Sequence, residues 1–390
     1  MTSSPKIITI FSLPPRTLAY YDWLLTGLSI LHEQGQIELR LAGAWWDRLL
    51  RSHPKAMRIA HRISSNLVDM ISPIDAVCVT GRFEIGGRAA NFAVDIADSP
   101  FVFATALLEA VDVYFKLQCP KTFEPEGFPI NRHIRAPYHP DVFTFQSKIR
   151  PGMLGRPLSH TPNLRRNLAV LRSWENSASQ KKDIRIFASF GTVDRPVART
   201  VNTPLPAQYN YFSESTLLAR YPGLIHHPNQ KRARVVQMLR EMNQPDIDAR
   251  LWRTNDASLY GRPLTEDEYH SYLGRSLWNV NISGLRRSIP YRLCDTILTG
   301  GTMITDTLAI RWHEPFEPFE VAEIGDLGYE LEGDVDWDSV RGSLEKIYAS
   351  GPQSADTARA VRDAYERKWS PAAFARYFVA ECEKALASSN

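Results

Sequence analysis

The sequence has few cysteines and no long apolar run. Its 390 residues include four cysteines that are far apart and form no CxxC pair. Zinc ligation is therefore not expected, and the thiols are typical of reduced, buried side chains in a cytosolic protein. No run approaches the ~18 apolar residues of a membrane-spanning helix, and the start MTSSPKIITIF lacks the apolar stretch of a signal peptide. We expect a cytoplasmic protein, whose contact with a membrane would be peripheral.

An excess of charge of one sign is also absent. The 46 basic and 43 acidic residues leave a net charge of +3, which gives no reason to expect a nucleic-acid partner. Apolar residues make up 44% of the chain and charged residues 23%. That composition is typical of a globular protein with sizeable hydrophobic cores.

The order of apolar segments predicts an α/β protein with two domains. Residues 6–11, 18–32 and 37–41 alternate as strand, helix and strand, which favours a parallel crossover. A polar segment, ENSASQKK, ends at residue 182, and the strand-like DIRIFASF follows it. We therefore predict one domain over residues 1–175, a second over 183–369, and a last helix over 370–390 that is available to dock back on the first domain.

The most informative stretch is residues 276–306, SLWNVNISGLRRSIPYRLCDTILTGGTMITD. Its pattern predicts a buried strand, a loop, a helix that starts near Pro290, a glycine turn and a second strand. In a parallel sheet this order brings Gly284, Arg286, Arg287 and the start of the helix to the carboxyl edge, where ligands bind. Guanidinium groups and free backbone N–H groups at that edge predict a site for an anion such as a diphosphate.

Arg292 and Asp295 are three residues apart and share a face of the predicted helix. Arg292 is a candidate to hold phosphate, and Asp295 is a candidate to accept hydrogen bonds from ribose hydroxyls. The alternative is a structural ion pair between the two side chains. For Arg286 and Arg287 the alternative is that they are solvated charges of the loop. Arg195, in the loop after the first strand of the second domain, is a further candidate to bind the anion.

The stretch resembles the donor-binding segment of nucleotide-sugar transferases of the exostosin-like and group 1 types. There a strand ends in a glycine loop, an arginine and an acidic residue follow on a helix, and a small-residue turn leads to a hydrophobic strand. The matching positions are Gly284, Arg292, Asp295 and Gly301. The family more often has Glu at position 295, and the shorter Asp reaches less far by one methylene; Met303-Ile304 stands where the family has Pro-Val.

This resemblance implies a GT-B fold, in which two Rossmann-like domains face each other across a cleft and C-terminal helices close back. It implies a glycosyltransferase that moves a sugar from a nucleotide-sugar donor to a saccharide or lipid-linked saccharide acceptor, for example in surface polysaccharide synthesis. The donor would be held mainly by residues 183–369 and the acceptor by residues 1–175. The family usually works without a bound metal, and we expect no other cofactor.

Two further motifs have a functional and a structural interpretation. Glu84 lies in the glycine-rich segment 81–87 and is our candidate for the base that activates the acceptor, with an ordinary surface glutamate as the alternative. Residues 334–338, DVDWD, resemble a metal-binding DxD motif, but capping of a helix that begins near residue 339 is the simpler interpretation. Because no base stands out, the alternative function is a non-catalytic protein that binds an anionic small ligand in its cleft.

Overall fold

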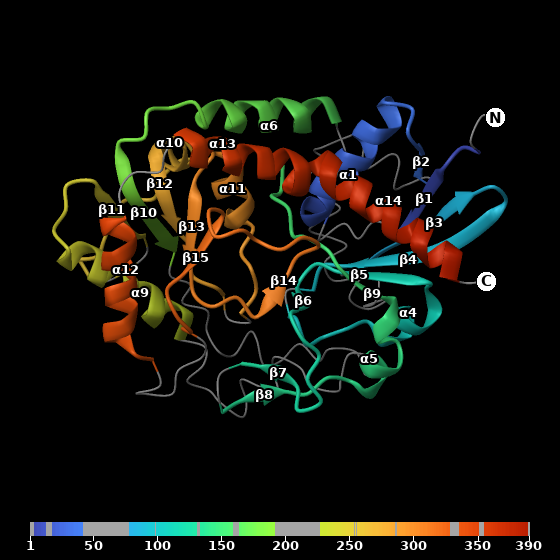
Figure 1. Ribbon diagram of the computed structural model, residues 1–390, viewed down its shortest axis with the longest axis horizontal. Helices are drawn as coiled ribbons and strands as arrows, with labels where there is room; N and C mark the ends of the chain where they lie inside the picture. The colour runs from blue at the N-terminus through green and yellow to red at the C-terminus, as the bar shows by residue number, and fades with distance from the viewer. Residues whose placement is uncertain are drawn as a thin grey trace, which may run out of the picture.

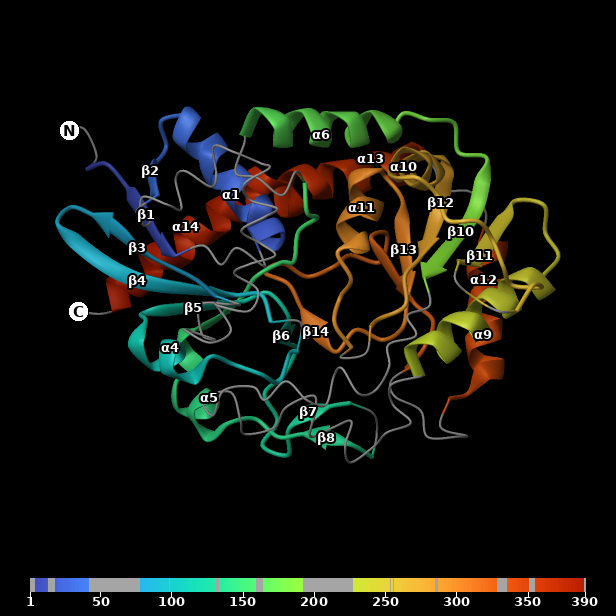
Figure 2. The ribbon, with the colours of Figure 1, turned by 180° about the vertical axis from the view of Figure 1, so that it is seen from behind.

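The structure is a computed structural model of the chain. It describes residues 4–12, 18–41, 78–97, 99–130, 133–158, 164–191, 227–252, 254, 256–284, 287–327, 335–350 and 355–388. Two sheets lie at opposite ends of the molecule, and helices cover them (Figures 1 and 2). The expected α/β class with two Rossmann-like sheets is confirmed.

The first half of the chain forms a six-stranded sheet with the order β2-β1-β3-β4-β5-β9. Its strands are β1 (Ile7–Ser12), β2 (Glu38–Leu41), β3 (Cys78–Ile85), β4 (Arg88–Asp95), β5 (Val113–Lys116) and β9 (Ile149–Pro151). Strands β1 and β2 are parallel and are joined through α1 (Leu18–Glu33), as the spacing of their apolar residues predicts. Strand β3 is antiparallel to both of its neighbours, so the sheet is mixed.

Most of the glycine-rich segment 81–87 is strand and not loop. Strand β3 continues through it to Ile85, and only Gly86 and Gly87, with φ of +58° and +78°, make the turn to β4. Gly81 lies within the strand. A side chain is excluded there because a Cβ atom would come within 2.5 Å of the Thr9 carbonyl oxygen and 2.3 Å of the Phe92 ring. Close packing, and not a loop, therefore explains the first glycine of this segment.

Short elements complete the first half. They are α4 (Thr105–Ala110), β6 (Cys119–Pro120), β7 (Phe128–Pro129), β8 (Arg135–Ala136), α5 (Pro140–Thr144), the 3₁₀ turn Gln146–Lys148 and α6 (Leu164–Ser177). Helix α6 lies along the top of the molecule in Figure 1 and leads to the second sheet.

The second half forms a five-stranded sheet in which all neighbours are parallel, with the order β11-β10-β12-β13-β15. The strands are β10 (Ile184–Gly191), β11 (Ile247–Trp252), β12 (Ser276–Val280), β13 (Thr302–Thr305) and β15 (Val321–Glu323). The helices are α9 (His227–Glu241), α10 (Glu266–Arg275), α11 (Arg292–Leu298) and α12 (Trp337–Ala349). The strand, helix and strand expected within residues 276–306 are thus confirmed as β12, α11 and β13.

Both faces of this second sheet are covered, as in a doubly wound fold. Ile186, Ala188 and Phe190 of β10 belong to the same buried cluster as apolar residues of α9 and α12. Phe187 points to the other face and packs with Leu273 and Tyr272 of α10. The alternation of side chains along a strand explains how one strand contacts both layers.

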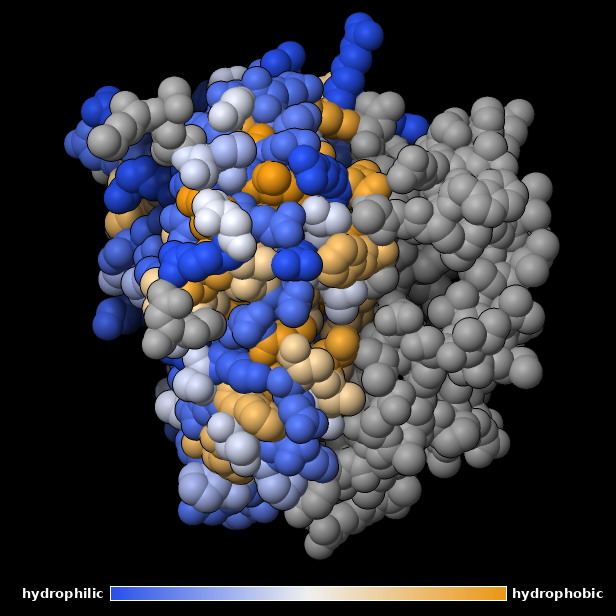
Figure 3. Space-filling model, turned by 90° about the vertical axis from the view of Figure 1, so that its right-hand side faces the viewer, coloured by the Kyte–Doolittle hydropathy of each residue, from blue (hydrophilic) through white to orange (hydrophobic). Residues whose placement is uncertain are grey.

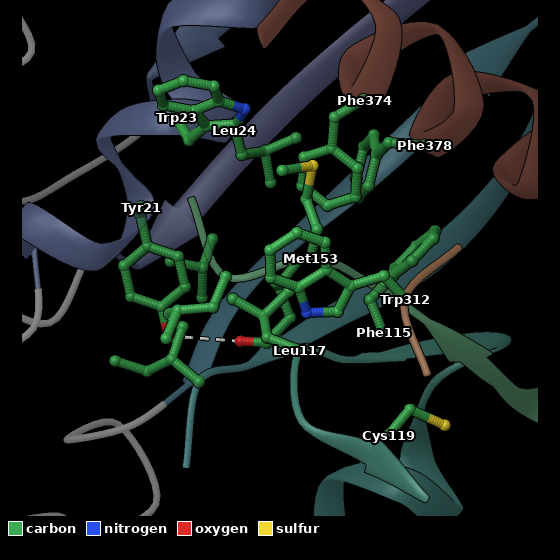
Figure 4. Close-up of a cluster of buried hydrophobic side chains, with 14 of the residues drawn as sticks. Tyr21, Trp23, Leu24, Phe115, Leu117, Cys119, Met153, Trp312, Phe374 and Phe378 are labelled. Carbon is green, nitrogen blue, oxygen red and sulfur yellow. Dashed lines mark hydrogen bonds between the residues drawn. The ribbon is translucent and has the colours of Figure 1, made fainter. Parts of the chain in front are cut away.

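The end of the chain returns to the first sheet. Helix α13 (Ala355–Ala364) runs through a π-helical turn, Tyr365–Trp369, into α14 (Pro371–Ser388), which packs on α1 and β4. The ring of Phe378 lies 5.0 Å from that of Phe92. It lies 4.6 Å from the ring of Phe115, and Figure 4 shows these two side chains. Burial of each such ring contributes about 1.5–3 kcal/mol, so α14 is an integral part of the first half.

The carboxyl edges of the two sheets face each other and meet. After β5 the chain forms β6, and after β13 it forms β14 (Ile310–Arg311), which pairs antiparallel with β6. The Gln118 side chain donates to the Ile289 carbonyl oxygen at 3.0 Å and accepts from the Ile289 N–H at 3.1 Å. Trp312 lies in the hydrophobic cluster of the first half (Figure 4). At this junction the halves therefore form a packed interface.

Candidate functional site at the edge of the second sheet

The order of the second sheet defines where a ligand site is expected. Strand β10 is the first strand of this half; the next strand in the chain, β11, lies on one side of it and β12 on the other. The connections from β10 and β12 leave in opposite directions, and the carboxyl ends of two such strands flank a crevice that binds ligands in doubly wound folds. Gly191 ends β10, and Asn281 to Gly284 follow β12 at this switch point.

Arg232 reaches the switch point from α9. Its Nη1 atom donates to the Gly191 carbonyl oxygen at 3.1 Å, and its guanidinium lies 6.0 Å from the centre of the Phe190 ring. Burial, and next the positive charge of Arg292, lowers the pKa of Arg232 to about 10. The two arginines are thus close enough to repel each other, although they come from different helices.

Arg292 is the first residue of α11 and is half-buried. It makes no hydrogen bond or ion pair with any other described residue. No carboxylate of the described residues lies within 4 Å of the Arg232 guanidinium either. An anion site without its anion should contain partly buried positive groups that no neighbouring carboxylate neutralises. Among the described residues, Arg232 and Arg292 meet this condition.

Arg287, by contrast, uses its guanidinium within the protein. Its backbone has a φ of +54°, and its side chain is buried. Nη1 donates to the Pro129 carbonyl oxygen at 3.3 Å, and Nη2 donates to the Thr307 carbonyl oxygen at 3.1 Å and to Asp326 at 2.9 Å. Arg287 therefore ties the second sheet to the first half, and its position gives no support to the expected direct contact with a diphosphate.

Asp295 also lies inside the protein. It is fully buried on α11, where its Oδ2 atom is 3.4 Å from Nη1 of Arg156 and its Oδ1 atom is 3.9 Å from Nε2 of His270. Its ion partner is thus Arg156, a residue of the first half, and the alternative of an ion pair with Arg292 is wrong. In this arrangement Asp295 faces away from solvent, so the structure does not bring it to the place expected for a ribose.

No local sequence pattern marks Arg156 or His270 as a site residue. Arg156 also donates to Glu266 at 2.8 Å, and its guanidinium lies over the rings of Trp174 and Tyr291. The His270 ring stacks on Trp174 at 4.3 Å. These groups come from four separate segments, so their meeting depends on tertiary packing that no local pattern records.

Glu84 lies far from the arginine pair. It is on β3, where it forms an ion pair with Arg82 at 3.2 Å. Figures 1 and 2 both place the β3–β4 hairpin at the end of the molecule that carries the two termini, whereas α11 belongs to the other half. The structure therefore does not bring Glu84 together with the expected donor-binding residues.

The remaining predicted residues fall into three groups. Gly284 lies just after β12, and a Cβ atom there would meet the Ser288 hydroxyl at 3.4 Å. Arg195 and Arg286 lie outside the described residues. Asp336 caps α12 by accepting from the Ser339 N–H at 2.9 Å, so the capping interpretation of the DVDWD segment is confirmed.

The described residues hold no group of three or more His, Cys, Asp or Glu side chains arranged to ligate a metal. Within the same residues, no helix combines the length and the apolar character needed to cross a membrane. On the coloured part of the face shown in Figure 3, apolar and hydrophilic side chains are interspersed. Among the described residues, the arginine pair is the feature that most clearly indicates a ligand.

Comparisons with known proteins do not identify a family. No family model matches the sequence, and no curated protein sequence matches it. Among solved structures, the chain is similar to a Listeria monocytogenes protein named as a candidate UDP-N-acetylglucosamine 2-epimerase, with a TM-score of 0.38, 8% identity, and coverage of 98% of this chain and 97% of that one. A TM-score this low carries no argument, so the fold and the site rest on the geometry above.

Proposed function

We propose that this protein is a nucleotide-sugar-dependent glycosyltransferase whose donor diphosphate binds between Arg232 and Arg292. The observation that carries the proposal is the pair itself: two half-buried guanidinium groups at the switch point of a doubly wound sheet, with no carboxylate of the described residues beside either. A diphosphate has the charge and the acceptor oxygens that this pair lacks.

The chemistry of sugar transfer suits such a pair. When the glycosidic bond to the donor breaks, the departing nucleoside diphosphate gains negative charge. Guanidinium groups that the fold already holds in place stabilise that charge without reorganising, and loss of one comparable group typically lowers a rate by about 100-fold or more. The acceptor would approach from the carboxyl edge of the first sheet, which meets the carboxyl edge of the second sheet through β6 and β14 (Figure 1).

The alternative is a binding protein without catalytic activity, and one observation favours it. The residue expected to act as base, Glu84, is on the distant hairpin and is paired with Arg82. A general base must come within hydrogen-bond reach of the acceptor hydroxyl. If nucleotides bind but no sugar is transferred, this second function is the correct one.

Titration calorimetry with UDP, GDP, CMP and dTDP tests the binding step, and mass spectrometry of reactions with the matching nucleotide sugars tests turnover. The glycosyltransferase proposal predicts micromolar-range binding of at least one nucleoside diphosphate and release of its sugar to an acceptor or to water. A folded protein that binds none of the nucleotides would rule out the glycosyltransferase.

A further inference from the structure

A buried lysine directly precedes Arg232 on α9. Lys231 is only 2% exposed, and its Nζ atom donates to the Ser283 hydroxyl at 3.1 Å, to the Asp306 carboxylate at 3.3 Å and to the Leu327 carbonyl oxygen at 3.2 Å. Three acceptors match the three N–H donors of a charged ammonium group. The lysine thereby connects α9 to the segments that follow β12, β13 and β15.

Asp306 is fully buried and carries its charge. Burial alone would raise the pKa of Asp306, but Lys231, the Ser283 hydroxyl and N–H, and Arg287 together hold that pKa below its usual value. The Ser283 N–H donates to Oδ1 at 2.7 Å. Asp306 also acts on Arg232, since its charge raises the pKa of that guanidinium against the larger effects of burial and of Arg292.

The charges at this edge can therefore be assigned to pairs. Lys231 neutralises Asp306, and Asp326 neutralises Arg287 at 2.9 Å. Arg232 and Arg292 remain, with two positive charges and no carboxylate among the described residues within ion-pair distance. Without the lysine, the Asp306 carboxylate, whose charge already acts on Arg232, would lose its ion-pair partner. A carboxylate that acts on a guanidinium competes with an incoming anion.

From this we propose that Lys231 is a positioning residue that acts as an electrostatic guard: by holding Asp306, it leaves Arg232 free to bind the anionic part of the ligand. A buried ion pair contributes little net stability compared with apolar side chains of the same volume, so a role in keeping the site electropositive explains why a charged pair lies here. The inference rests on the anion site proposed above and extends it to a residue that does not touch the ligand.

The test uses the full chain, inorganic pyrophosphate and the tightest-binding nucleoside diphosphate. Lys231→Met leaves Asp306 unpaired, and affinity for both probes should fall by about tenfold, the effect of losing one charge-assisted hydrogen bond. In the double variant Lys231→Met with Asp306→Asn the unpaired negative charge is gone, and the side-chain amide can hydrogen-bond with the Ser283 hydroxyl. Affinity should then return to within about threefold of the wild type.

Lys116→Met is the matched control. Lys116 is fully buried at the carboxyl edge of the first sheet and pairs with Asp95 at 3.0 Å. This variant should lose stability, measured as melting temperature, without a change in pyrophosphate affinity per folded molecule. The guard role is wrong if Lys231→Met binds pyrophosphate as the wild type does. It is also wrong if the double variant at positions 231 and 306 binds as poorly as Lys231→Met although its melting temperature recovers.

The pyrophosphate arm separates the two proposals. A wild-type protein that binds pyrophosphate but no nucleotide contradicts the proposed function, while the response of pyrophosphate binding to Lys231→Met still decides the guard role. A wild-type protein that binds neither probe contradicts the anion site, and with it both proposals.

Discussion

His313 makes the stability of the junction between the two halves sensitive to acid. Its Nε2 atom lies 2.8 Å from the Lys368 carbonyl oxygen and must donate to it, and its ring contacts those of Trp369, Phe374 and Tyr377 at 4.7–5.2 Å. The Nδ1 atom is buried and has no hydrogen-bond partner among the described residues. Burial, with the nearby charge of Lys368, lowers the pKa of His313 from 6.5 to about 4.

The sign and size of the effect follow from this pKa. The native state keeps the ring neutral, whereas the unfolded chain takes up a proton below about pH 6.5, so stability is lost as the pH falls from 6.5 to 4. A shift of this size is worth about 3 kcal/mol in full, of which about 2 kcal/mol is lost between pH 7 and pH 5. Near pH 5.3 the slope corresponds to an uptake of almost one proton on unfolding.

The assay is urea unfolding of the wild type and of His313→Gln at pH 7 and pH 5. Glutamine cannot titrate, and its amide can still donate to the Lys368 carbonyl, so the variant should lose about 2 kcal/mol less than the wild type on acidification. His133→Gln, at an exposed position, should keep the wild-type response. An acid response of His313→Gln equal to that of the wild type would refute the assigned environment of this ring.

Three other variants test the junction and the site. Gln118→Ala leaves the buried N–H and carbonyl of Ile289 without partners, so the free energy of unfolding measured in urea should fall by about 2–4 kcal/mol; a loss below 1 kcal/mol would show that the clamp is unimportant. Asp295→Asn removes the buried counter-ion of Arg156 and should cost about 3 kcal/mol, whereas a purely ligand-binding Asp295 would leave the melting temperature unchanged. Glu84→Gln should leave both nucleotide binding and sugar transfer unchanged, because Glu84 lies on the distant β3–β4 hairpin and pairs with Arg82; loss of transfer with binding retained would restore it as the base.

The local elements of the second half could be predicted from the sequence because their signals are local. Strand β12, helix α11 and strand β13 follow from apolar spacing and glycine positions, and the Thr265–Glu268 capping box marks the start of α10. Asp336 caps α12 for the same reason. Each of these features depends on residues within a few positions of one another.

The candidate site could be predicted only in part. Arg292 was found through its place after β12, but Arg232 lies in an amphipathic helix in which nothing distinguishes it from its neighbours Arg234 and Lys231. The partner of Asp295 is Arg156, 139 positions earlier by subtraction of the residue numbers, and that contact follows from how α11 packs on the first half. The composition of residues 81–87 is compatible both with a strand and with a glycine loop. Only a tertiary contact, the packing of Gly81 on Phe92, decides between the two.

Arg292→Ala provides the most direct test of the central claim, that two uncompensated arginines at the edge of the second sheet hold a diphosphate. Titration calorimetry with the tightest-binding nucleoside diphosphate should show an affinity that is roughly 10- to 100-fold weaker than that of the wild type, with an unchanged melting temperature because Arg292 has no partner among the described residues. Arg359→Ala, on the exposed face of α13, is the control and should bind as the wild type does. Equal affinity of the Arg292 and Arg359 variants would contradict the account.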